Sequence, residues 1–147
     1  MKKAVFVSVL FMAAASGCLD FGEDVETDNP TQQQLEFCEA VMHLNPQMDY
    51  QPAGMKVIGS GIDGAAWMVF STEETQTGAI FDTAYVSPGS LLGTASVYSP
   101  DDMPEWWNPS EYKLTGGIIE LSDGCFLNVG MNRTSGGTVV FIFWNEI

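Results

Sequence analysis

The chain has 147 residues, of which 46% are apolar, so it is long enough for one domain with a sizeable hydrophobic core. It carries 19 acidic against five basic residues, a formal net charge of −14. Such a surface repels nucleic acid, phosphorylated ligands and anionic lipid headgroups, so we expect no nucleic-acid partner. A cation or a basic protein is compatible with it, and so is acidity that only keeps a domain in solution.

The first 17 residues have the layout of an export signal. Lys2 and Lys3 form a basic start, and an apolar run broken only by Ser8 follows from residue 4 to residue 15. This length fits the apolar region of a secretory signal and is too short for a transmembrane helix, which needs about 20 residues. Three small residues then lead directly into Cys18.

This order of features resembles the signal peptide and lipobox of bacterial lipoproteins. The resemblance implies a diacylglycerol on the Cys18 thiol, cleavage before Cys18 and, usually, acylation of the new amino group, a palmitate-type modification. We therefore expect a membrane partner through this lipid and a place in the cell envelope. Leu19 after the lipidated cysteine favours the outer membrane facing the periplasm, if the cell is Gram-negative. An ordinary secretory signal is the alternative.

Cleavage divides the chain into a signal (1–17), an acidic stretch (18–30) and a single domain (31–147). The acidic stretch has no helix or strand period, which predicts a flexible tether. Removing the two lysines of the signal takes the net charge from −14 to −16.

Two cysteines remain once Cys18 carries lipid. Cys38 and Cys125 form an even pair in an oxidising compartment, which predicts a disulfide between them. The bond would close a loop of about 90 residues, for which the chain-entropy model gives about 4–5 kcal/mol. Two buried thiols are the alternative.

One helix is predicted. Thr31 and Gln34 have the spacing of a capping box, and the pair at 29–30, with its proline, is an alternative start. Apolar residues between 35 and 44, including Cys38, recur at helical spacing and predict a buried stripe. Pro46 should end the helix at the residue before it.

The rest of the chain predicts strands separated by turns. Asp-Gly pairs at 63–64 and 123–124 and the polar run 132–137 mark the turns. Strands are expected at 55–61, 66–72, 112–121, 125–131 and 138–144, with 79–86 as a strand or short helix. The last of the strands is β-branched or aromatic throughout, which is typical of a central strand covered on both faces.

Short connections favour an antiparallel meander of about five or six strands, since parallel pairs need long crossovers. Cys125 and every second residue after it should face one side of the sheet. If the helix covers that side, Cys125 meets Cys38. The expected fold class is α+β, with one N-terminal helix packed on an antiparallel sheet. A small β-barrel or sandwich with the helix as a lid is the alternative.

The most unusual segment, 99–109, contains three prolines, which exclude regular structure. It also holds a group of acids and aromatic side chains: Asp101, Asp102, Glu105, Trp106 and Trp107. These residues suit a binding loop, because indoles stack on sugars and peptide groups and are enriched at interface hot spots. Alternatively, the indoles fold back and cap the sheet. The acids lack the spacing of an EF-hand, and we expect no metal.

The sequence contains no catalytic constellation. His43 is the only histidine and no nucleophile-elbow motif accompanies it; near a helix end, its cation would interact favourably with the helix dipole. One histidine and a cysteine pair do not make a zinc site. The Gly-Ser-Gly run at 59–61 lacks the further glycine of a dinucleotide site, so we expect no catalytic residue and no cofactor.

Residues 103–107, 114–117 and 128–130 resemble stretches of functionally unassigned exported bacterial proteins, a resemblance that implies no activity. The expected function is a non-enzymatic binding module of the envelope, with an envelope protein or a glycan as its partner. Two alternatives are a carboxylate-based hydrolase of envelope glycan, which needs two converging carboxylates, and a structural component of an envelope assembly, which needs an exposed apolar patch.

Overall fold

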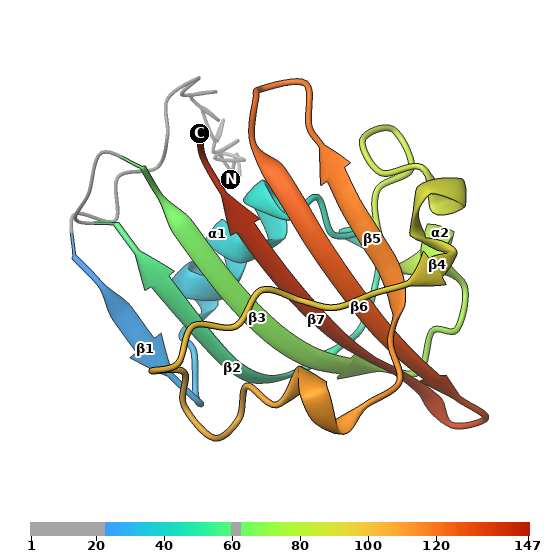
Figure 1. Cartoon of the computed structure of the whole chain (residues 1–147), viewed down its shortest axis with the longest axis horizontal. Coiled ribbons are helices and arrows are strands. Elements are labelled where there is room, and N and C mark those ends of the chain that lie inside the picture. The colour runs from blue at the N-terminus through green and yellow to red at the C-terminus, as the bar shows by residue number, and fades with distance from the viewer. Residues whose placement is uncertain (1–22, 60–62) are drawn as a thin grey trace, which may run out of the picture.

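The computed structural model describes residues 23–59 and 63–147 (Figure 1). The predicted signal and Cys18 lie outside these residues. Within them, the strands are β1 (Val25–Thr27), β2 (Gln51–Ile58), β3 (Ala65–Thr72), β4 (Gly93–Thr94), β5 (Thr115–Glu120), β6 (Phe126–Thr134) and β7 (Gly137–Asn145). The helices are α1 (Gln32–Val41) and α2 (Thr77–Ile80), with 3-10 turns η1 (Pro88–Leu91) and η2 (Pro109–Glu111).

The strands form one open antiparallel sheet of seven strands in the order β1-β2-β3-β7-β6-β5-β4. The expected α+β class with an antiparallel sheet is confirmed, and the sheet is not closed into a barrel. The expected meander of five or six strands is wrong in number, because the sheet has seven strands. It is also wrong in order, because β7 pairs with the whole length of β3 and so lies beside the first half of the chain. The unexpected strands are the short β1 and β4 at the two edges.

Part of the expected tether is folded. Val25 pairs with Val57 and Thr27 with Met55, so β1 is an edge strand rather than a solvated segment. The Glu26 carboxylate lies 3.5 Å from the Lys56 ammonium across the same pair of strands. Three residues carry too little pattern to reveal a strand in the sequence, and the neighbouring β2 supplies the partner that makes them one.

The start of α1 follows the sequence closely, and its end does not. Thr31 Oγ1 accepts a hydrogen bond from the Gln34 N–H (3.3 Å) and Gln34 Oε1 accepts one from the Thr31 N–H (2.8 Å), which confirms the capping box. The helix ends at Val41, before the expected stop at Asn45. His43 adopts a left-handed conformation with φ 51°, and such a residue ends a helix by turning the chain away from the axis.

One face of the sheet carries the main core. Alternating residues of β6, Leu127, Val129 and Met131, point into it together with Cys125, as the period-2 pattern predicted. Helix α1 contributes Phe37 and Cys38, and the Phe37 ring meets the Trp144 ring edge-on at 6.1 Å between centroids. The chain just after α1 adds Met42 and Leu44 to this core, and the segments around α2 and η1 complete it with Ile80, Phe81, Val86 and Leu91.

The opposite face is covered as well. On β7, Val140, Ile142 and Trp144 face the main core. The residues that alternate with them, Val139, Phe141 and Phe143, pack on the opposite face beside Trp67 and Val69 of β3. The chain between β4 and β5 (95–114) runs across this face, while α1 lies on the other (Figure 1). We call residues 95–114 the crossing segment. Strand β7 is thus packed on both faces, as its apolar sequence predicted.

Candidate binding surface

The crossing segment is fastened to the sheet by hydrogen bonds from two side chains. Asn128 of β6 is buried; its Nδ2 donates to the Ser96 carbonyl (3.0 Å), and its Oδ1 accepts from the Tyr98 N–H (2.8 Å). Trp67 Nε1 of β3 donates to the Tyr98 carbonyl (3.2 Å). The backbone of Tyr98 is therefore held at both its N–H and its carbonyl.

Trp107 of the predicted binding loop is part of the core. Its side chain is 6% exposed and its ring meets Phe141 of β7 edge-on, with centroids 5.4 Å apart. Its Nε1 donates to Ser99 Oγ (2.8 Å), so the one polar atom of the indole is satisfied without solvent. The alternative that the sequence left open, an indole that caps the sheet, describes this residue.

The Trp106 ring lies against Gly54 of β2. A Cβ built on Gly54 of β2 would stand 2.2 Å from Trp106 Cδ2, so the ring occupies the space that any other side chain would need. Trp106 stays half-buried and meets Trp107 edge-on at 6.4 Å. The two indoles therefore act mainly as packing for the crossing segment.

The three acids of the loop do not gather into one site. Asp102 is paired with the Lys56 ammonium at 3.5 Å, and the same ammonium reaches Glu26 at 3.5 Å. The Asp102 side chain is 80% exposed, so this ion pair adds little stability. Asp101 and Glu105 are exposed. In residues 23–59 and 63–147, no three acidic, histidine or cysteine side chains stand close enough together to hold a metal ion.

An aromatic surface is present beside these tryptophans. Phe143 of β7 stacks on Trp67 at 4.8 Å between centroids, and the Tyr98 ring lies 4.9 Å from Phe143. Tyr98 is 55% exposed, Phe143 is half-buried and Trp67 is buried. We call these three residues the aromatic surface. The Lys56 ammonium lies 6.0 Å from the Trp67 ring centroid, which adds a cation at its margin.

Sequence reasoning missed the aromatic surface and looked instead to the adjacent tryptophans. The alternation in β7 could have placed Phe143 on a shared face with Phe141. Nothing in the local sequence shows that Tyr98, from a segment without a period, would stand beside Phe143.

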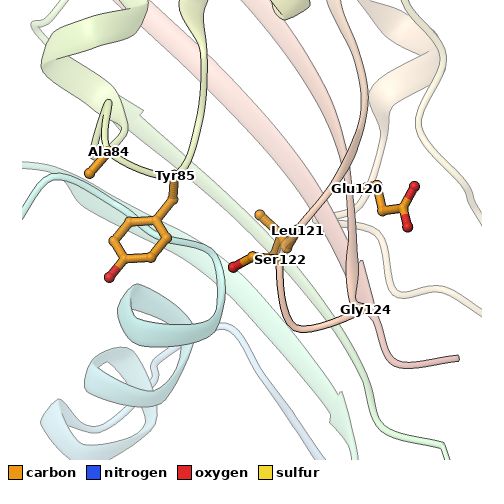
Figure 2. A pocket seen from close by; sticks show the side chains of 6 residues that line it. All are labelled: Ala84, Tyr85, Glu120, Leu121, Ser122 and Gly124. Carbon is orange, nitrogen blue, oxygen red and sulfur yellow. The ribbon is translucent and has the colours of Figure 1, made fainter.

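A second feature lies on the α1 side of the sheet. A hollow of about 570 Å³ opens between the loop that carries Ala84 and Tyr85 and the turn from Glu120 to Gly124. Figure 2 shows Tyr85 on one wall, Leu121 and Ser122 on the other, and the Glu120 side chain pointing away from Tyr85. The hollow therefore lies alongside the outer end of β5.

His43 packs against the Tyr85 ring. The two rings stack with centroids 4.1 Å apart and an angle of 15° between their planes. Burial lowers the pKa of His43 below its usual 6.5, and the nearby Asp123 and Asp82 oppose this shift. The fold thus favours the neutral imidazole of His43 over the imidazolium cation that was expected at the end of the helix.

Cys38 and Cys125 both lie buried in the main core, and the structure has them as thiols rather than as a disulfide. Burial, and secondarily the Glu39 carboxylate, raises the pKa of Cys38 to about 12. The two residues belong to the same cluster, as the periodicity required, and the bond between them stays a prediction.

A scan against protein-family models finds no match to this chain, and neither curated proteins nor solved structures give one. Among the described helices, none is both long and apolar enough to cross a membrane. The site is therefore interpreted from its own geometry.

Removal of the Trp107 indole should destabilise the packing of the crossing segment on the sheet. We expect Trp107→Ala to lower the free energy of unfolding by about 3–5 kcal/mol, the usual cost of emptying a buried aromatic site. Chemical denaturation measures this. The matched control is Glu105→Ala, an exposed residue of the same segment, which should change stability by less than about 0.5 kcal/mol. Equal effects of the two changes would contradict the core assignment of Trp107.

His43 should make the protein less stable in mild acid. Because the folded state binds its proton less readily than the unfolded state, its contribution is complete above pH 6.5 and is lost as the pH falls below that value. We expect thermal unfolding to show a larger loss of Tm between pH 7.5 and pH 5 in the natural protein than in His43→Asn. Asparagine tolerates a positive φ, so the variant keeps the backbone turn. Parallel pH profiles would contradict the assignment.

Proposed function

We propose that this chain is a lipid-anchored protein of the bacterial cell envelope that binds a protein or glycan partner and catalyses no reaction. Residues 1–17 would export it and Cys18 would carry the lipid, with the outer membrane facing the periplasm as its place in a Gram-negative cell. The basic start, the apolar run and the small residues before Cys18 support this part of the proposal.

The observation that carries the binding role is the aromatic surface. An exposed Tyr98 ring stands against Phe143, and its backbone is fixed by Asn128 and Trp67 rather than left to move. A rigid aromatic face loses little conformational entropy when a partner covers it, which is why Tyr and Trp serve as anchors in binding sites. Both a sugar ring and a peptide group can stack on such a face.

The lipid anchor is tested in the native host. We expect mass spectrometry of the purified protein to find an N-terminal Cys18 with a diacylglycerol, and Cys18→Ser to leave the membrane fraction for the soluble fraction. The matched control is Cys38→Ser, which removes a thiol from the core and should leave the protein with the membrane. An uncleaved, unmodified N-terminus would refute the anchor.

The binding role is tested with Tyr98→Ala. The hydrogen bonds at Tyr98 are made by its backbone, so removal of the ring should leave the crossing segment in place and near-ultraviolet circular dichroism nearly unchanged. We expect crosslinking in intact envelopes to lose one specific partner.

The matched control is Tyr112→Ala, another exposed tyrosine of the crossing segment (37% against 55%), which belongs neither to the aromatic surface nor to the hollow. It should retain the partner that Tyr98→Ala loses. An unchanged partner with Tyr98→Ala, or the same loss with both variants, would remove the aromatic surface from the function.

A further inference from the structure

The outer edge of β5 is only partly occupied. Strand β4 pairs Gly93 with Gly116 and Thr94 with Thr115, and in the described chain no strand pairs with the last residues of β5 on that side. Turn η1 approaches the strand at Gly117, where the Ser90 carbonyl oxygen would stand 2.8 Å from an added Cβ. The pairing with β4 ends at Gly116, so the unpaired part of this edge lies after that residue.

The hydrogen bonds at the two ends of β5 show which backbone groups face this opening. The Leu121 N–H donates to the Cys125 carbonyl (2.8 Å), and the Ala95 N–H donates to the Leu114 carbonyl (3.0 Å). In an antiparallel strand, the N–H and C=O of one residue point to the same side, and successive residues alternate. The backbone N–H and C=O groups of Ile119 and Leu121 thus point toward β6. Those of Ile118 and Glu120 point toward the open edge.

Space for another chain lies beside these groups. The hollow of about 570 Å³ is lined on one side by consecutive residues from Glu120 to Ser122. Two of the most exposed large apolar side chains flank the same edge: Leu92, just before β4, is 74% exposed, and Ile118 is 70% exposed. Unpaired backbone groups, room beside them and apolar side chains next to them are the three features that strand addition uses.

The charge of the side chains beside the β5 edge indicates which kind of chain can bind there. Of the two residues that carry the open groups, Glu120 is the charged one and its side chain is exposed; the exposed Asp123 lies in the turn that follows. No lysine or arginine lines the hollow. The Arg133 guanidinium stays at the opposite end of β5, where it donates to Thr115 Oγ1 (2.9 Å). A second copy of this chain would bring its own net charge of −14 to an acidic edge, so self-pairing is disfavoured.

We propose that the open edge of β5 binds a short extended segment of a basic partner protein, which adds to the sheet as a further strand. The partner's backbone would pair with the outward N–H and C=O groups of Ile118 and Glu120. An apolar side chain of the partner would pack against Ile118, and a lysine or arginine would lie opposite Glu120. This site goes beyond the aromatic surface, because it is made of backbone groups and a strand edge.

The test uses the full chain with Cys18→Ser and two fluorescent octapeptides, one of alternating lysine and valine and one of alternating glutamate and valine. Fluorescence anisotropy gives the affinities, and amide chemical shifts locate the contact. We expect the lysine peptide to bind about tenfold or more tightly than the glutamate peptide, with shifts confined to the residues around Ile118 and Glu120. Failure of the lysine peptide to bind, or equal affinities of the two peptides, would overturn the proposal.

Two changes separate strand addition from simple attraction of charges. The Ile118 N–H faces the open edge and makes no hydrogen bond to β6. Ile118→Pro removes this N–H and should therefore weaken binding of the lysine peptide by about tenfold. A lysine peptide with alternate backbone nitrogens methylated along one edge should lose affinity similarly, and this measurement needs no variant to fold. Two such peptides are made, one methylated along each edge. The proposal would be overturned if neither of them binds more weakly than the unmethylated peptide.

Glu120→Lys should reverse the preference in favour of the glutamate peptide. The matched control is Glu105→Lys, which makes the same change in net charge on the crossing segment and should retain the preference. Equal loss in both variants would show attraction by net charge alone. A dimer in analytical ultracentrifugation that Ile118→Pro dissolves would make a second copy the occupant and overturn the proposal. A negative result here leaves the role of Tyr98 intact, because crosslinking tests that role separately.

Discussion

The architecture depends on burying both faces of the two central strands. Strands β3 and β7 are apolar at successive positions, so neither face can be left in water. Helix α1 and the segments around α2 and η1 supply side chains to the core on one face. The other face has no helix, and an irregular chain with three prolines does the same work with Trp107, Val97 and Leu114. Trp106 and Trp107 thus pack on the sheet, whereas the Tyr98 ring of the same segment stays exposed at its margin.

Two of the three basic residues in the described part of the chain are occupied within the fold, and the third, Lys113, is exposed. Lys56 lies between Glu26 and Asp102, and Arg133 donates to the Thr75 carbonyl (2.9 Å) and to Thr115 Oγ1 (2.9 Å), which ties the region of α2 to β5. What remains on the surface is mostly acid. A partner that reaches this surface meets a field of one sign, which favours basic proteins and neutral glycans over anionic ligands.

The sequence reveals those parts of the structure that depend on neighbours along the chain. The capping box at Thr31 and the alternation after Cys125 are local patterns, and both are found in the structure. The composition of residues 138–144 also predicts their double burial. The pairing of β7 with β3 depends instead on contacts between distant residues, and so do β1 and β4, which are too short to carry a pattern. The same applies to the site. From the sequence, the Trp107 indole could bind a ligand or pack in the core, and only the position of β7 beneath it decides between the two.

The place of β7 has a consequence for how the molecule comes to be folded. Strand β7 joins the two halves of the sheet, since it lies between β3 and β6. Without β7, β2 and β3 form a hairpin with one edge bare, and such a fragment is only marginally stable. The two halves therefore become one cooperative unit only when β7 pairs with both of its neighbours, and a substitution that weakens β7 should loosen the first and the second half of the chain together.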